Sequence, residues 1–326
     1  MPQVDQSSTN EAFTVIAHRG ASGYLPEHTL EATAMAHAMG ADFIEQDVVL
    51  TRDGALVVLH DLYLDAVTDV AIHFPDRMRQ DGHHYALDFD LEEIRTLHVN
   101  ERKAANGLAA FPGRFPDSGN IFRVPTLEEQ IILIQGMNHS TGRNVGLYIE
   151  PKSPAWHLQH GRDILAESVS ILSRYGYESK TDRVILQSFD TNTLRRARDE
   201  LSSELKLVQL IGDNSWGESD TDFDQLLSPV GLGNIKNYAD GIGPWLMQIV
   251  QIDSTTGDVQ ATPLIEQAHR HDLFVHAYTL RADQLPEELN NFDQAMSFLT
   301  SQTALDGVFT DFPDKAIQFL KRSLTL

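Results

Sequence analysis

Short apolar runs rich in Val, Ile and Leu recur along the chain, and polar residues or glycine bound each of them. Runs of this length are typical of buried β-strands. The pattern predicts eight strands, at residues 13–18, 43–48, 145–150, 183–189, 205–210, 239–244, 273–279 and 306–311.

Apolar residues at spacings of three and four lie between most of these strands and predict helices there. The expected helices span residues 29–39, 161–175, 191–203, 260–271 and 313–323. Eight strand–helix units favour an α/β fold that closes into a (β/α)₈ TIM barrel. A doubly wound sheet is the alternative, but HRGASGYLP after the first strand lacks the spacing of its usual G-x-G-x-x-G turn.

Residues 69–125 interrupt this alternation with Phe-Pro and Gly-Arg turns. A barrel of this class needs about 250 residues. We therefore expect the segment to be a small inserted lobe within a single barrel domain that spans residues 1–326. Just before the lobe, Asp53-Gly54 predicts a hairpin turn after the second strand, and residues 55–60 would return from it as a further strand.

Two other groups of polar residues give only weak evidence for a metal site. The histidines of the lobe show no fixed ligand spacing, so we expect mostly surface positions for His73, His83, His84 and His98. The acidic stretch at 213–224 lacks the glycine and the final Glu register of an EF-hand, so we expect a solvated loop there.

Composition and charge exclude several classes of function. The net charge of −22 repels nucleic acid and anionic membranes, so an anionic substrate would need a local positive centre. No apolar run approaches the roughly 18 residues of a membrane span, and we expect no stable membrane insertion. The chain has no cysteine, which excludes disulfides, thiolate metal sites and a cysteine nucleophile.

Carboxylates gather where the predicted strands end. Glu45 and Asp47 point the same way because side chains alternate along a strand, and Glu150 ends the next strand. Two carboxylates about 4 Å apart repel by roughly 4 kcal/mol at an effective dielectric of 20, so three together require a cation or shared protons. Oxygen ligands alone select Ca²⁺ or Mg²⁺. The alternative is a set of structural ion pairs with barrel lysines or arginines.

Histidines and cations stand beside these carboxylates. His18 ends the first strand and His60 ends the return strand, so one could act as a base and the other as an acid. Arg19 and Lys152 supply the positive charge that a phosphate needs, or else neutralise the carboxylates in a metal-free site. Other ionisable groups on the strand ends are His276, Tyr278 and Asp311.

At these residues the chain resembles the glycerophosphodiester phosphodiesterases, and the bacterial periplasmic type in particular. The resemblance runs from about Phe13 to the end of the chain, inserted lobe included. It is carried by VIAHRGASGYLPEHTLEA, FIEQDVVLTRDGALVVLHD, YIEPK, LQSFD, YADGIGP and GVFTDFPDKA. Together these motifs are highly specific, whereas HRG alone would not be. Pro151 stands where many relatives have an aliphatic residue.

The resemblance implies a (β/α)₈ barrel with one divalent cation, Ca²⁺ first and Mg²⁺ as the alternative. Three carboxylates match the metal ligands of the family, two histidines match its acid–base pair, and two cations match positions lining the phosphate. These residues are, in that order, Glu45, Asp47 and Glu150; His18 and His60; and Arg19 and Lys152.

The reaction implied is hydrolysis of glycerophosphodiesters, such as glycerophosphocholine, to glycerol 3-phosphate and an alcohol. In the family mechanism the 2-hydroxyl of the substrate's own glycerol attacks first. His18 would take that proton and His60 would protonate the leaving alcohol, and the two roles can swap in the second, hydrolytic half.

Three other functions fit these residues less well. A relative that acts on intact lipid should show an exposed apolar or basic face, which the net charge of −22 opposes. A non-catalytic binding protein would usually have lost one of the histidines or carboxylates. A metallohydrolase with a His-x-His pair on the first strand is excluded, because Arg19-Gly20 follows His18.

We expect small-molecule glycerophosphodiesters as partners, with no nucleic acid, and leave a homodimer open. The polar stretch MPQVDQSSTNEA resembles the start of a mature chain, so we expect a secretory signal upstream of about Gln3 and a periplasmic or secreted enzyme. A native start at Met1 would instead place the enzyme in the cytoplasm.

Overall fold

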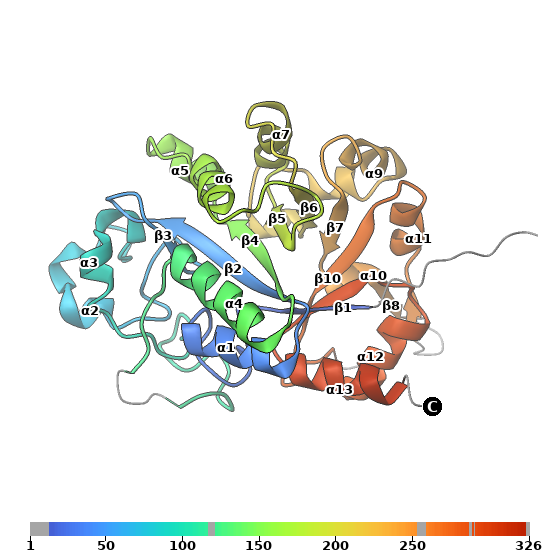
Figure 1. Ribbon diagram of the computed structural model, residues 1–326, viewed down its shortest axis with the longest axis horizontal. Coiled ribbons are helices and arrows are strands. Elements are labelled where there is room, and N and C mark those ends of the chain that lie inside the picture. The colour runs from blue at the N-terminus through green and yellow to red at the C-terminus, as the bar shows by residue number, and fades with distance from the viewer. Residues whose placement is uncertain (1–12, 117–120, 253–258, 287–288, 290, 324–326) are drawn as a thin grey trace, which may run out of the picture.

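Eight parallel strands close into a barrel in the computed structural model of the chain, which describes residues 13–116, 121–252, 259–286, 289 and 291–323 (Figure 1). In order around the barrel they are β1 (Thr14–Ala17), β2 (Phe43–Leu50), β4 (Gly146–Pro151), β5 (Val184–Ser188), β6 (Lys206–Ile211), β7 (Gly241–Pro244), β10 (Phe274–Leu280) and β11 (Gly307–Thr310). Pairing of β11 with β1 completes the ring. The predicted barrel is confirmed, and each predicted strand boundary lies within two residues of the observed one.

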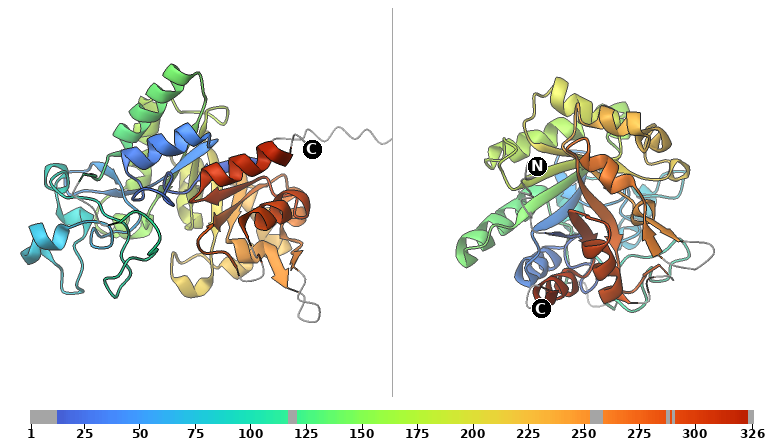
Figure 2. Two further views of the ribbon diagram at one scale, coloured as in Figure 1. Left: turned by 90° about the horizontal axis from the view of Figure 1, so that it is seen from below. Right: turned by 90° about the vertical axis from the view of Figure 1, so that its right-hand side faces the viewer.

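Helices surround the barrel (Figure 2). The longer ones are α1 (Leu30–Met39), α4 (Leu127–Thr141), α6 (Ile164–Arg174), α7 (Thr191–Asp199), α9 (Pro229–Ile235), α12 (Phe292–Ser301) and α13 (Pro313–Ser323). The shorter ones are α2 (Val70–His73), α3 (Leu91–Ile94), α5 (Pro154–Gln159), α8 (Phe223–Leu226), α10 (Leu246–Ile249) and α11 (Leu264–His269). No helix among the described residues is long and apolar enough to cross a membrane.

Some helices differ from the prediction. The helix expected at 260–271 begins only at Leu264, because β9 (Val259–Ala261) pairs with β8 (Val250–Ile252) in a separate hairpin. The pattern also did not predict α4 or α12. A signal for α4 was present, since Thr126 and Glu129 form a capping box at its start.

Alternation along the strands separates an apolar barrel floor from a polar mouth. Ile16, Tyr148, Ile185 and Phe309 belong to one buried cluster that also holds Phe43. Glu45, His18 and Glu150 lie two positions after three members of this cluster, on the same side of the chain. Those members are Phe43 on β2, Ile16 on β1 and Tyr148 on β4.

One close approach on the floor requires glycine. A Cβ added to Gly146 would lie 2.4 Å from the Phe43 ring and 2.7 Å from a backbone oxygen, so no larger residue fits at this start of β4.

Beyond the barrel rim, β3 (Leu56–Val58) pairs antiparallel with β2, so the predicted hairpin is confirmed. Residues of the 69–125 segment then pack a hydrophobic cluster of their own against this hairpin. The segment holds α2 and α3 and lies beside β3 in Figure 1. The expectation of a surface position is wrong for His84, which is buried and lies 2.6 Å from Asp65.

Candidate active site

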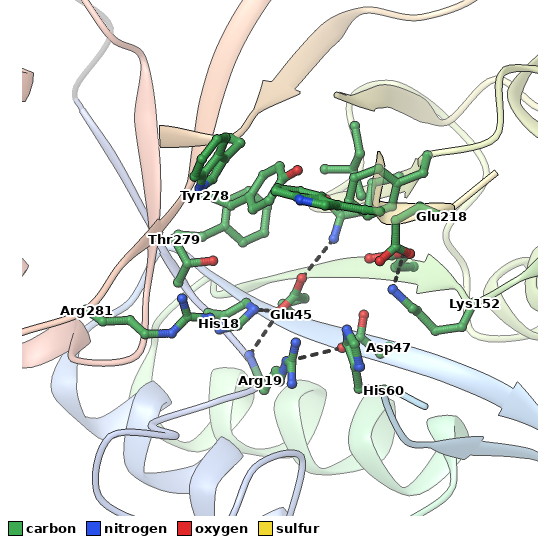
Figure 3. Close-up of a pocket in the computed structure, with 17 residues that line it drawn as sticks. His18, Arg19, Glu45, Asp47, His60, Lys152, Glu218, Tyr278, Thr279 and Arg281 are labelled. Carbon is green, nitrogen blue, oxygen red and sulfur yellow. Dashed lines mark hydrogen bonds and ion pairs between the residues drawn. The ribbon is translucent and has the colours of Figure 1, made fainter. Parts of the chain in front are cut away.

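A cavity of about 210 Å³ opens at the carboxyl ends of the barrel strands (Figure 3). Drug-sized ligands usually occupy about 300–1,000 Å³, so this cavity suits a smaller molecule. The seven site residues predicted from the sequence all line it, although they come from four separate segments of the chain. They are His18, Arg19, Glu45, Asp47, His60, Glu150 and Lys152.

The three carboxylates converge because inward positions of β2 and β4 lie side by side. Asp47 is the register partner of Glu150, and ligand oxygens of Glu45, Asp47 and Glu150 all lie within 4.8 Å of one another. All three residues are buried. Lys152 donates to Glu150 at 2.7 Å and Gln187 donates to Glu45 at 2.9 Å, whereas Asp47 Oδ1 has no hydrogen-bond partner among the described residues.

Burial and mutual repulsion control the protonation of this cluster. Burial, followed by the charge of Asp47, raises the pKa of Glu45 well above its usual range. Burial also raises the pKa of Glu150 to about 8, despite the Lys152 ammonium. Burial alone would raise the pKa of Asp47 too, but a 2.8 Å hydrogen bond from His28 and nearby positive charges hold it well below its usual range. Burial and mutual repulsion therefore favour the protonated forms of Glu45 and Glu150.

His18, directly after β1, has two ring nitrogens in different environments. Nδ1 lies 2.6 Å from Asp311 Oδ1, whereas Nε2 lies 3.7 Å from a Glu45 oxygen. Burial, followed by the charge of Arg19, lowers the pKa of His18 from 6.5 to about 4. The ring is therefore neutral at pH 7. With Nδ1–H donated to Asp311, the lone pair lies on Nε2.

His60, just after β3, repeats this arrangement. Its Nδ1 lies 2.7 Å from Asp61 Oδ1, and the other Asp61 oxygen accepts a 2.7 Å hydrogen bond from Arg102. Burial, followed by the charges of Arg19 and Lys152, lowers the pKa of His60 to about 3. Both histidines thus have a carboxylate at Nδ1, which leaves Nε2 for chemistry.

Arg19 joins the carboxylates to the loop after β1. Its backbone N–H donates to Glu45 at 3.0 Å, and its guanidinium donates to Glu27 at 3.1 Å. The guanidinium Nε lies 3.5 Å from Asp47. The residue has a left-handed φ of 58°, which costs free energy for a side chain of this size and is the kind of strain found at functional sites.

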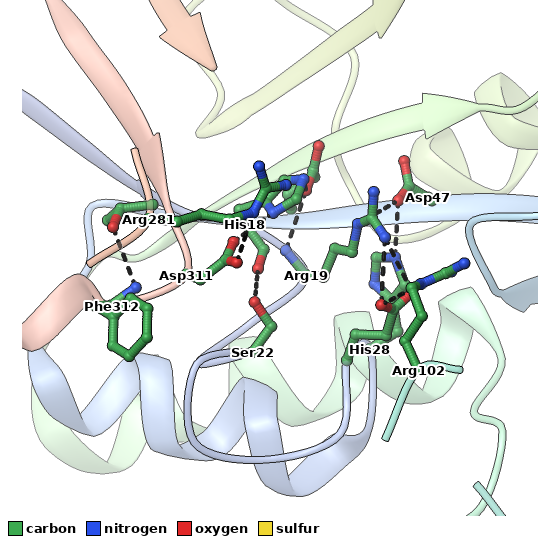
Figure 4. Close-up of polar contacts among 12 residues, drawn as sticks. His18, Arg19, Ser22, His28, Asp47, Arg102, Arg281, Asp311 and Phe312 are labelled. Atoms are coloured by element: carbon green, nitrogen blue, oxygen red, sulfur yellow. Dashed lines mark hydrogen bonds and ion pairs between the residues drawn. The ribbon is translucent and has the colours of Figure 1, made fainter. Parts of the chain in front are cut away.

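Two arginines of the 69–125 segment reach the carboxylates that hold the histidines. Arg102 bonds Asp61, as described above. Arg114 donates to Asp311 at 2.6 Å. Arg281, which lies beside Asp311 in Figure 4, donates to the same oxygen at 2.9 Å. Arg102 also makes a two-pronged contact with Glu27, at 2.8 and 2.7 Å.

The opposite side of the cavity is aromatic. Phe189 follows β5, Trp216 lies in the loop after β6, Trp245 follows β7 and Tyr278 lies on β10. These four strands are neighbours in the barrel. We refer to these four residues as the aromatic wall.

Sequence reasoning missed the partners of the two histidines. Asp61 directly follows His60, and Asp311 ends the last strand. The sequence position of each aspartate could therefore have indicated that it lies near the site. Arg102 and Arg114 had none, because only the fold brings their loop to the barrel mouth. The expectation of a solvated loop at 213–224 also missed that Trp216 lines the cavity.

Comparison with known proteins yields relatives along almost the whole chain. The profile of the glycerophosphoryl diester phosphodiesterase family matches residues 18–315. A glycerophosphodiester phosphodiesterase of Haemophilus influenzae is 43% identical over 325 residues, which cover 94% of this chain and 89% of the relative. One of Treponema pallidum is 37% identical over 324 residues, which cover 94% of this chain and 91% of the relative.

Solved structures show the same fold. A phosphodiesterase of Oleispira antarctica, in complex with the product sn-glycerol-3-phosphate, superposes with a TM-score of 0.64 at 21% identity and covers 94% of this chain and 96% of its own. A glycerophosphodiester phosphodiesterase of Agrobacterium tumefaciens has a TM-score of 0.62 at 21% identity, covering 94% of this chain and 100% of its own.

Proposed function

Because the chain belongs to the glycerophosphoryl diester phosphodiesterase family and is an enzyme of that activity, we propose how its barrel mouth performs the reaction. One divalent cation and two histidines would together hydrolyse a glycerophosphodiester to glycerol 3-phosphate and an alcohol. The observation that carries this proposal is the arrangement of the three clustered carboxylates with two histidines, each with a carboxylate at Nδ1.

The carboxylate cluster fits a hard divalent cation. Its ligand oxygens are close enough to share one ion, and Asp47 Oδ1 has no hydrogen-bond partner among the described residues. Burial is the main cause of the raised pKa values of Glu45 and Glu150, and a bound cation would favour their ionised forms. Glu45, Asp47 and Glu150 would hold the ion, for which we propose Ca²⁺, with Mg²⁺ as the alternative. When bound, the ion would neutralise charge on the phosphoryl oxygens.

The histidines and cations supply the remaining chemistry. Arg19 and Lys152 would bind the phosphodiester anion. His18 Nε2 would accept the proton of the glycerol 2-hydroxyl as that oxygen attacks phosphorus, and His60 Nε2 would protonate the leaving alcohol. Loss of the alcohol would leave a cyclic phosphate, in which two glycerol oxygens are bonded to phosphorus. Water would then open this ring, with His60 as the base and His18 as the acid.

The free site favours the neutral form of His60, and we propose that the ring gains its proton when the substrate binds. Burial, followed by Arg19 and Lys152, lowers its pKa to about 3. A bound phosphodiester anion would offset those two cations and thereby favour the protonated ring.

An assay of glycerol 3-phosphate release tests this proposal. We expect activity to be abolished by chelation after dialysis and restored by Ca²⁺ or Mg²⁺. His18→Ala and His60→Ala should each lower kcat by about 10²–10⁴-fold or more. Both variants should still be stabilised against unfolding when the ion is added. Full turnover in excess chelator would refute the cation, and an active histidine variant would refute that residue's role.

A 2-deoxy substrate tests the tethered nucleophile separately. Intramolecular attack can remove several kcal/mol of barrier, whereas one hydrogen bond contributes only about 1 kcal/mol. We expect a fall of at least about a thousandfold, roughly 4 kcal/mol. Cleavage within about tenfold of the parent would make water the first nucleophile.

We also propose that the enzyme is periplasmic or secreted, on the basis of its resemblance to the periplasmic type. The relevant N-terminal residues 1–12 lie outside the described residues. Reading the genomic open reading frame and fractionating the source cells test this location, and recovery in the cytoplasmic fraction would overturn it. A homodimer remains to be tested by light scattering.

A further inference from the structure

The barrel mouth is divided into an ionic side and an aromatic side (Figure 3). The ionic side comes mainly from β1, β2 and β4, with His60 after β3 and Arg281 after β10. The aromatic wall comes from β5, β6, β7 and β10 and the loops that follow them. The mechanism proposed above uses only the ionic side, so the aromatic wall is available for another part of the substrate.

The rings of the aromatic wall stand edge to face. Trp216 and Trp245 have ring centroids 5.3 Å apart, with planes at 69°. Phe189 and Tyr278 have centroids 5.9 Å apart, with planes at 90°. The Tyr278 hydroxyl is occupied by a 2.9 Å hydrogen bond to the Ile211 carbonyl, so its ring is the part that remains for a ligand.

Glu218 adds a negative charge to this side of the cavity. Its residue lines the cavity together with the aromatic wall, and Figure 3 shows its carboxylate there. Among the described residues, this carboxylate forms no hydrogen bond or ion pair, in contrast to the carboxylates of Glu45, Asp47 and Glu150. Burial, followed by the charges of Glu150 and Glu218, raises the pKa of Tyr278.

The Lys152 ammonium lies 5.5 Å from the centroid of the Phe189 ring. Burial would lower the pKa of Lys152, but nearby carboxylates, chiefly Glu150 and also Glu218, raise it. The rings of Trp216, Trp245 and Tyr278 line the same cavity as Glu218 and are suited, with that carboxylate, to an organic cation. Ring faces attract a quaternary or primary ammonium through their quadrupole, and a carboxylate adds direct attraction. Such groups are recognised by charge as well as by shape. A neutral sugar or glycerol group could donate hydrogen bonds to Glu218, but it would gain neither charge–charge nor cation–π attraction.

We infer that the aromatic wall and Glu218 form a subsite for a cationic head group, as in choline or ethanolamine esters of glycerol phosphate. The inference rests on the proposed function, which places the phosphate and the glycerol 2-hydroxyl on the ionic side. The leaving alcohol then extends towards the aromatic wall. Its ammonium lies two carbons beyond the ester oxygen, and Trp216 and Glu218 line the same cavity as the residues proposed to bind the phosphate.

A neutral isostere separates charge from shape. The test compares kcat/KM for glycerophosphocholine with kcat/KM for its 3,3-dimethylbutyl analogue, in which carbon replaces the quaternary nitrogen. We expect the choline ester to be favoured at least tenfold by the wild-type enzyme, chiefly through KM. Equal kcat/KM for the two substrates would overturn the inference.

Variants locate the preference. We expect Glu218→Gln and Trp216→Leu each to lower the choline-to-dimethylbutyl ratio at least threefold, whatever their effect on overall rate. Matched controls are Glu266→Gln, an exposed carboxylate on α11, and Trp156→Leu, an indole on α5 that does not line the cavity, and both should keep the wild-type ratio. An unchanged ratio in Glu218→Gln and Trp216→Leu would assign the preference elsewhere and refute this subsite.

Binding measurements keep this inference distinct from the proposed reaction. Calorimetry with the His60→Ala enzyme, in which we expect slow turnover, compares the binding of the two ligands, and an assay of glycerol 3-phosphate in the same samples detects any cleavage. Tighter binding of glycerophosphocholine than of the isostere supports the subsite even if the catalytic roles are wrong. Equal binding contradicts the subsite even if glycerol 3-phosphate is released normally.

Discussion

At the scale of single residues, the site depends on carboxylates that orient imidazoles. Asp311 holds His18 and Asp61 holds His60, each through Nδ1 at 2.6 and 2.7 Å. Such a bond fixes the tautomer and the ring orientation, as in the Ser-His-Asp triad. Asp311 and Asp61 are thus positioning residues for the two histidines.

We predict that Asp311→Asn and Asp61→Asn lower kcat by about 10²–10⁴-fold, because the asparagine amide no longer fixes the histidine tautomer. Steady-state kinetics across pH should show the loss mainly in kcat, with a displaced pH profile. The control is Asp314→Asn, since Asp314 accepts from Tyr24 at 2.9 Å and contacts neither histidine. A kcat within threefold of wild type in both test variants would remove the positioning role.

A buried histidine outside the site predicts how stability depends on pH. His157 accepts the Leu50 N–H at 3.3 Å and bonds the Ser153 carbonyl at 3.2 Å. Burial lowers its pKa from 6.5 to about 4. Between these values only the unfolded chain binds the proton, so the free energy of unfolding falls as pH drops from about 6.5 to 4.

We predict that His157→Gln flattens this acid decline, by on the order of 2–3 kcal/mol across the window. Denaturant unfolding at a series of pH values measures the slope, which the loss of the two hydrogen bonds does not by itself change. The control is His139→Gln, at an exposed position on α4. The prediction would be contradicted if the free energy of unfolding of His157→Gln fell between pH 6.5 and 4 by as much as that of the wild type.

At the scale of elements, the 69–125 segment, which we predict to be an inserted lobe, is coupled to the barrel mouth. Arg102 bonds Asp61 and Arg114 bonds Asp311, so one arginine reaches the partner of each histidine. Charge-assisted bonds of this kind are among the stronger contacts that proteins form. The lobe thus helps to hold the site in place.

We predict that Arg102→Gln and Arg114→Gln each lower kcat by roughly 10- to 100-fold, because a loosened carboxylate no longer aligns its histidine. KM should change less, and lysine substitutions should recover part of the loss. Arg95→Gln is the control, since Arg95 lies in the same segment and makes an exposed ion pair with Glu129 at 3.1 Å. If kcat of Arg102→Gln and Arg114→Gln equals that of Arg95→Gln, residues 69–125 do not position the site.

At the scale of the whole molecule, negative charge on the protein repels an anionic substrate and also destabilises the folded state. The chain carries a net charge of −22, and three of its carboxylates meet in one buried cluster. A cation at this cluster would stabilise the folded state by mass action, about 2.7 kcal/mol at an ion concentration 100-fold above Kd.

We therefore predict that Ca²⁺ or Mg²⁺ raises Tm by several degrees and that a chelator reverses the rise. Glu45→Gln should blunt this response, while Glu266→Gln at an exposed position should retain it. Differential scanning calorimetry at fixed ionic strength measures the shift. An equal rise in both variants would show that the ion binds elsewhere.

The sequence alone was sufficient for the strand pattern and for the seven candidate site residues. Buried parallel strands are nearly continuous apolar runs, so ionisable residues such as Glu45 and Asp47 stand out at once. Resemblance to a family then supplied their expected roles. Helix α4 was missed although its capping box was visible.

The tertiary structure alone decided which distant residues complete the site. Arg102 and Arg114 follow no periodic pattern, and their partners Asp61 and Asp311 lie far away in the sequence. The aromatic wall likewise forms only when β5, β6, β7 and β10 become neighbours. Local propensity and spacing act over a few residues, whereas these contacts depend on closure of the barrel.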